Sequence, residues 1–131
     1  MLLLPLLTLT GCKDSPPDHQ LYLDQFRGAW DSSREGFETC LLIRSVEMRG
    51  ECAGSTVAEA VRQGDEAAGS WCAEIPDVMW RSECWFTLAE VLAAQGKREA
   101  AAQACASSAE LAHILKQNCL EHFDRYVPME P

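Results

Sequence analysis

Cysteine is the residue type in this chain with the greatest chemical potential. Seven occur among 131 residues, at Cys12, Cys40, Cys52, Cys72, Cys84, Cys105 and Cys119. Thiols at this density either bind metal in a reducing compartment or form disulfides in an oxidising one. No Cys-x-x-Cys sequence occurs, so there is neither a thioredoxin-type redox pair nor a zinc-ribbon knuckle. The compartment therefore decides which chemistry these thiols have.

The N-terminus predicts export. Residues 1–10 are an uncharged apolar run that is too short to span a bilayer but has the length of a signal-peptide core. The run ends in Leu9-Thr10-Gly11-Cys12, which resembles the lipobox of bacterial lipoproteins. The resemblance implies cleavage before Cys12 and lipidation of its thiol. We therefore expect a signal peptide at 1–11, a lipidated cysteine with a Pro-containing linker at 12–19, and one helical domain at 20–131.

Acylation of Cys12 would hold the mature protein at a membrane of the bacterial cell envelope. Lys13 follows the cysteine, and by resemblance to enteric sorting rules this favours the outer membrane, with the domain facing the periplasm or the cell surface. In an exported chain the other six cysteines are expected to form disulfides.

Other chemistry has little support in the sequence. His-Glu-x-x-His, Gly-x-Ser-x-Gly, Ser-x-x-Lys and glycine-rich phosphate-binding sequences do not occur. A zinc set of Cys105, His113, Cys119 and His122 can be drawn, but surface histidines are the favoured interpretation. The formal net charge of −9 argues against a nucleic-acid partner, which would need basic patches. We expect no enzymatic activity, no cofactor and no metal.

The spacing of apolar residues predicts helices throughout and no strand. A Ser32/Glu35 capping box is expected to start the second helix, and Gly50 to end that segment. The expected ranges are 18–30, 32–44, 56–63, 66–75, 77–94, 97–108 and 111–126. The chain is therefore predicted to be all-α.

The helices also show an internal period. Cys40 and Cys72 are 32 residues apart, as are Gly64 and Gly96. Helix-turn-helix units of this length resemble tetratricopeptide repeats, and the best-matching positions are Trp85, Leu88, Ala89, Leu92, Gly96, Ala101 and Cys105. The resemblance implies a short right-handed superhelix of antiparallel helix pairs. A non-repeating helical bundle remains the alternative.

A closer resemblance is to the cysteine-rich, Sel1-like branch of that superfamily, in which disulfides join consecutive units. This resemblance implies the pairs Cys40–Cys52, Cys72–Cys84 and Cys105–Cys119. Each would close a loop of about a dozen residues and stabilise the fold by roughly 2–3 kcal/mol. Pairing within each hairpin, as Cys52–Cys72 and Cys84–Cys105, remains open, since six cysteines allow fifteen connectivities.

These features predict an envelope lipoprotein that binds a protein or peptide on a helical-repeat scaffold. Trp71, Trp80 and Trp85 cluster in sequence around Cys72 and Cys84. Core packing is the favoured interpretation of these tryptophans, and an exposed binding surface is the alternative. Two other functions remain open: a cell-wall enzyme of the cysteine-rich Sel1-like type, and a purely structural envelope protein.

Overall fold

The computed structural model describes residues 16–26, 31–108 and 117–122, and no residue in these ranges belongs to a strand. The prediction of an all-α chain is therefore confirmed for this part of the protein. The helices are α1 (Asp18–Phe26), α2 (Arg34–Leu41), α3 (Val46–Arg62), the 3₁₀ helix η1 (Glu66–Glu74), α4 (Val78–Ala94) and α5 (Arg98–Ser108). Residues 117–122 are also helical.

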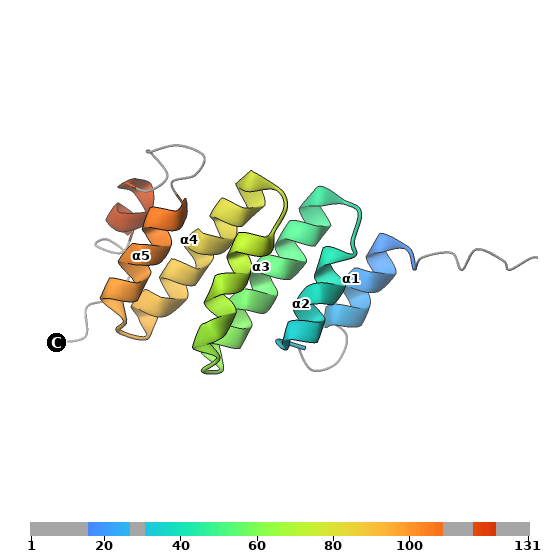
Figure 1. The fold of residues 1–131 in the computed structure, drawn as a ribbon, viewed down its shortest axis with the longest axis horizontal. Helices are drawn as coiled ribbons and strands as arrows, with labels where there is room; N and C mark the ends of the chain where they lie inside the picture. The colour runs from blue at the N-terminus through green and yellow to red at the C-terminus, as the bar shows by residue number, and fades with distance from the viewer. Residues whose placement is uncertain (1–15, 27–30, 109–116, 123–131) are drawn as a thin grey trace, which may run out of the picture.

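The helices form two rows (Figure 1). One row contains α1, α3 and α4, which contact one another in that order. The second row contains α2, η1 and α5, and each of these helices runs antiparallel to a neighbour in the first row. The buried residues between the rows include Phe37, Val57, Val61 and Leu88. Consecutive helices thus form a side-by-side series of hairpins.

The 32-residue period is visible in the structure. Helices α3 and α4 are both 17 residues long, and their N-caps, Ser45 and Asp77, are 32 residues apart. Each cap side chain accepts a hydrogen bond from a backbone N–H in the first turn, which satisfies an otherwise unpaired donor. The turns after these helices contain Gly64 at φ +100° and Gly96 at φ +76°, a backbone region that favours glycine.

An arginine repeats at the same interval. The Arg49 guanidinium donates to the carbonyl of Ile43 at 2.9 Å, and the Arg81 guanidinium donates to the carbonyl of Ile75 at 2.8 Å. Both isoleucines are buried. Each arginine therefore ties the first turns of its helix to the chain that enters the helix.

Three disulfides link successive hairpins: Cys40–Cys52, Cys72–Cys84 and Cys105–Cys119. These are the pairs that the Sel1-like resemblance implies. In each pair the Cα atoms are 5.5 or 5.6 Å apart, within the usual range for this bond. All six cysteines are buried.

The prediction that Gly50 ends a helix is wrong. Gly50 lies inside α3, which is one continuous helix where the sequence predicted a break and a short helix at 56–63. A Cβ on Gly50 would lie 2.2 Å from Cγ of Trp80. The glycine is thus required for close contact between α3 and the indole of α4, and it does not act as a helix stop.

Two predicted helix starts also differ. Helix α2 is capped by Ser33, whose hydroxyl accepts from the N–H of Gly36 at 3.2 Å, so the Ser32/Glu35 capping box is wrong. Helix α1 begins at Asp18, so the last two residues of the predicted linker are helical. The Asp18 carboxylate accepts from the N–H groups of Arg44 and Ser45, both at 2.8 Å, which fixes the start of α1 to the turn before α3.

Candidate functional site

The three tryptophans of the predicted binding surface lie in three different places. Trp71 on η1 packs against Phe37 of α2, with ring centroids 5.4 Å apart. Trp80 packs on Gly50 of α3, and Trp85 of α4 faces the space between η1 and α5. All three are half-buried. The structure therefore uses each indole at a separate contact between helices.

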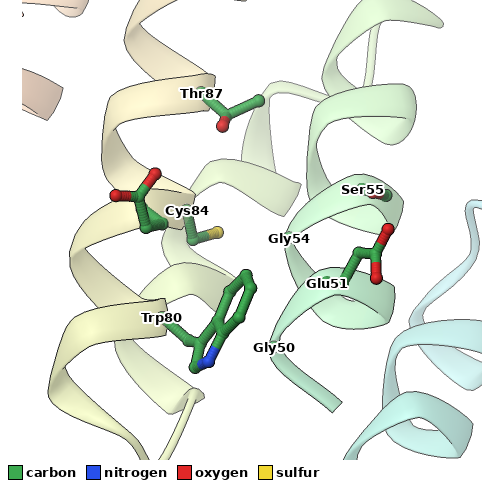
Figure 2. Close-up of a pocket in the computed structure, with 8 residues that line it drawn as sticks. Gly50, Glu51, Gly54, Ser55, Trp80, Cys84 and Thr87 are labelled. Carbon is green, nitrogen blue, oxygen red and sulfur yellow. The ribbon is translucent and has the colours of Figure 1, made fainter. Parts of the chain in front are cut away.

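One depression lies between α3 and α4, and we call it the α3–α4 groove (Figure 2). It encloses about 170 Å³. The indole of Trp80 forms one end, and the small residues of α3 leave the helix surface bare beside it. Its polar lining comes from Glu51, Ser55, Glu83 and Thr87. The exposed carboxylates of Glu51 and Glu83 give this groove a negative rim.

Tyr22 of α1 extends this acidic surface. Partial burial, followed by the nearby negative charge of Glu51 and a hydrogen bond to it, raises the pKa of the Tyr22 phenol. The phenol therefore stays protonated and donates to the Glu51 carboxylate at neutral pH.

A larger depression lies between η1 and α5, and we call it the η1–α5 groove. It encloses about 420 Å³, which is sufficient for a large side chain. Its floor comes from the first row of helices and is apolar, consisting of Val61, Trp85, Leu88 and Leu92. Its rim comes from the second row and is polar, consisting of Glu66, Ser70, Lys97, Gln103 and Ser107. An apolar floor with a few polar groups at the rim is the usual make-up of a binding pocket.

An ion pair crosses one end of the η1–α5 groove. The Lys97 ammonium contacts the Glu66 carboxylate, and its hydrogen bond and charge lower the pKa of that carboxyl. Both side chains are substantially exposed, so they can exchange this partner for a charged ligand at little cost.

The proposed zinc set does not form. Cys105 and Cys119 are joined in a disulfide and have no thiolate to offer, while His113 is outside the described residues. His122 contacts Glu90 of α4 at 2.5 Å, and its ring lies 5.4 Å from that of Phe86. These contacts attach residues 117–122 to α4. Within the described ranges no cluster of three or more metal-ligating side chains occurs.

Cys12, the predicted lipidation site, lies outside the described residues, as does the predicted signal peptide. None of the described helices is both long enough and apolar enough to cross a membrane.

Comparisons of the chain with protein-family models, with curated proteins and with solved structures found no match. The class of protein that the structure defines is a helical, disulfide-linked one with a 32-residue internal period.

Proposed function

We propose that this chain is a lipid-anchored protein of the bacterial cell envelope, and that it binds a protein or peptide partner on a scaffold of tetratricopeptide/Sel1-like repeats. The observation that carries the proposal is the η1–α5 groove, which has an apolar floor containing Trp85 and a polar rim. Tryptophan is enriched among the residues that dominate protein–protein affinity, because a buried indole removes a large apolar area from water.

The disulfides support a binding role. Cys72–Cys84 joins η1 to α4, the helix that carries Trp85. Cys105 anchors α5, the other wall of the groove, through Cys119. A site fixed in this way loses little conformational entropy when a ligand binds, which raises affinity. Helical repeats in general offer their partners extended surfaces of this kind.

The anchor supports a location close to the membrane. Five residues separate Cys12 from Asp18, where α1 begins. At about 3.3 Å per residue they span at most about 17 Å. A lipid on Cys12 would therefore keep the helical domain near the bilayer, and its partner would be a protein that reaches the same surface. Cys12→Ser is expected to release the protein from washed membranes into the soluble fraction.

Site-specific photo-cross-linking in cells tests the binding role. A photoreactive side chain at Gln103, on the rim of the groove, is expected to give one reproducible cross-linked partner. The matched control is Ala102, an exposed residue of the same helix outside the residues that line either groove. Equal cross-linking from both positions, or none from Gln103, would contradict the proposal.

A further inference from the structure

The second row of helices contains two equivalent contacts, related by the 32-residue period. We call the contact between α2 and η1 the first joint and the contact between η1 and α5 the second joint. Residue i of the first joint corresponds to residue i + 32 of the second. The two joints have the same backbone plan, because α3 and α4 correspond throughout and both bear a disulfide to the preceding helix.

The first joint is filled by an aromatic pair. Phe37 is fully buried, and the ring of Trp71 lies at 42° to it with centroids 5.4 Å apart. The guanidinium of Arg34 lies over both rings, 5.3 Å from that of Phe37 and 5.5 Å from that of Trp71. This arrangement combines aromatic packing with a cation–π contact.

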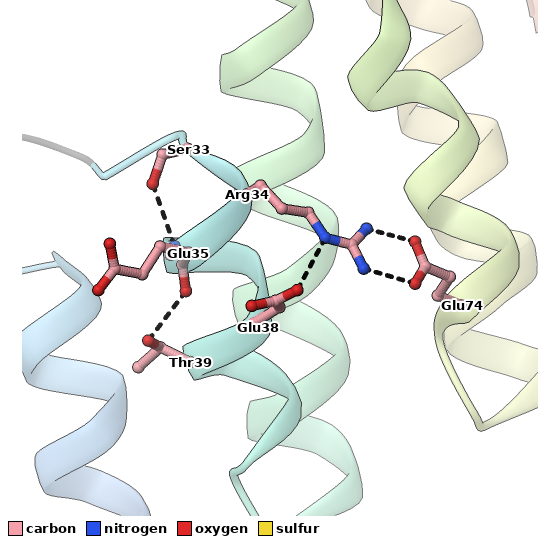
Figure 3. Close-up of polar contacts among 7 residues, drawn as sticks. Ser33, Arg34, Glu35, Glu38, Thr39 and Glu74 are labelled. Carbon is pink, nitrogen blue, oxygen red and sulfur yellow. Dashed lines mark hydrogen bonds and ion pairs between the residues drawn. The ribbon is translucent and has the colours of Figure 1, made fainter.

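A carboxylate holds that guanidinium in place. Arg34 Nη2 donates to Glu74 Oε1 at 2.7 Å, and a second hydrogen bond from Arg34 makes the contact with Glu74 bidentate (Figure 3). The first joint therefore contains an aromatic group, a cation above it and an anion that fixes the cation.

The second joint lacks this aromatic pair. Gly69 occupies the position of Phe37, and Gln103 occupies the position of Trp71. Trp85 occupies the position of the buried Ala53, so an indole rises from the row beneath, but the space between η1 and α5 stays open as the η1–α5 groove. The groove is thus the place where the repeat has lost its own filling.

The charge at the rim is also reversed. Glu66 occupies the position of Arg34, and Ala106 occupies the position of Glu74. The second joint therefore keeps a carboxylate and an indole but supplies neither a second ring nor a cation above the rings, since the charge of Lys97 is engaged with Glu66 at the end of the groove.

We propose that the η1–α5 groove binds a segment of the partner protein that presents an aromatic side chain together with an Arg or Lys one helical turn before it. The aromatic ring would pack on Trp85 in the space that Phe37 and Trp71 fill in the first joint. The cation would pair with Glu66 and lie over the two rings, as Arg34 does. This inference rests on the proposed function and specifies its ligand.

Binding of a designed peptide tests the inference directly. The probe is a 12-residue helical peptide with Arg and Phe three positions apart on an Ala/Gln background, the spacing of Arg34 and Phe37. It is titrated against the full chain in non-ionic detergent, with detergent alone as the blank. The shift of the Trp85 indole N–H signal, assigned with Trp85→Phe, reports binding in the groove. Control peptides with Phe→Ala or Arg→Gln are each expected to bind about tenfold more weakly.

Variants of the chain separate groove binding from binding elsewhere. Gln103→Trp restores the aromatic residue of the first joint and is expected to fill the groove and weaken peptide binding at least about tenfold. Because Gln103 is exposed, the change leaves the core intact. Ala102→Trp adds the same side chain to an exposed neighbouring position of α5 and is expected to leave binding unchanged. Glu66→Gln removes the counter-charge and is expected to weaken the Arg peptide but not the Arg→Gln peptide.

Two results would overturn the inference: absence of a Trp85 shift at millimolar peptide, and equal binding by Gln103→Trp and the parent chain. If Gln103 still cross-links a partner in cells while the peptide fails, the ligand chemistry is wrong and the scaffold role stands. If the peptide binds in the groove and no cellular cross-link forms, the groove chemistry stands and the proposed function fails.

Discussion

Two glycines of α3 provide a test of how this helix packs on α4. Gly50 and Gly54 lie one turn apart on the same helix. A Cβ on Gly50 would lie 2.2 and 2.3 Å from Cγ and Cδ2 of Trp80, atoms that cannot move away without moving the indole. A Cβ on Gly54 would lie 4.0 Å from its nearest neighbours on Cys84, which is ordinary van der Waals contact.

The two Gly→Ala substitutions should therefore have opposite effects. Each gains up to about 1 kcal/mol, because alanine favours a helix interior over glycine. Gly54→Ala keeps this gain and should stabilise the protein. Gly50→Ala must separate α3 from α4 or displace Trp80, and overpacking of this kind costs about 1–3 kcal/mol. Because the propensity gain is common to both, the two variants should differ in stability by about 1–3 kcal/mol.

Equilibrium unfolding in urea under non-reducing conditions measures this difference. Intrinsic fluorescence follows the transition, and circular dichroism checks that both variants fold to the same helical content. Gly50→Ala should also shift the emission of the folded state, since Trp80 is displaced. Equal free energies of unfolding for the two variants would refute the close α3–α4 contact.

The other predictions concern single contacts. Replacing both Cys72 and Cys84 by Ala opens a loop with a sequence separation of 12 and should lower the free energy of unfolding by about 3 kcal/mol, measured in urea; no loss would contradict a stabilising bond. Asp77→Ala removes a cap that accepts from two backbone N–H groups of α4 and should cost about 1 kcal/mol in the same assay. Hydrogen bonds from Arg34 lower the pKa of Glu74, so their stabilisation is present above the ordinary carboxyl pKa and is lost as the pH falls through the lowered one. Glu74→Gln should therefore be less stable than the parent at pH 7 and equal to it at pH 2; a difference that persists at pH 2 would contradict this assignment.

Much of the helical plan follows from local chemistry in the sequence. Gly64 and Gly96 mark real helix ends because the chain turns there with positive φ, which other residues resist. Asp77 after Pro76 marks a real helix start for similar local reasons. The apolar spacing around Leu88 and Leu92 correctly indicates a helix with a buried face.

Errors arise where a distant residue decides the structure. Gly50 has the same local appearance as a helix stop, but its role is set by Trp80, thirty positions further along the chain. Ser32 and Ser33 are equally good caps by sequence, and the structure uses Ser33. The tryptophans cluster in sequence near one disulfide, yet successive helices point their indoles into separate contacts.

The η1–α5 groove was not predicted, although a signal for it is in the sequence. The 32-residue period was counted on cysteines and glycines, which mark turns and joints. The same count applied to the aromatic residues would have placed Gly69 against Phe37 and Gln103 against Trp71. That substitution of small and polar residues for rings indicates an unfilled contact between repeats. Only the side-chain packing shows that Trp85 and Leu88 line the space.

The central claim is a series of helix pairs joined by disulfides between neighbours, and a disulfide map tests it most directly. Trypsin cleaves after Lys and Arg, so each of the six cysteines falls in its own peptide: 35–44, 50–62, 63–81, 82–97, 99–116 and 117–125. Mass spectrometry of the unreduced protein should find 35–44 linked to 50–62, 63–81 to 82–97, and 99–116 to 117–125. Links between 50–62 and 63–81, or between 82–97 and 99–116, would contradict the account.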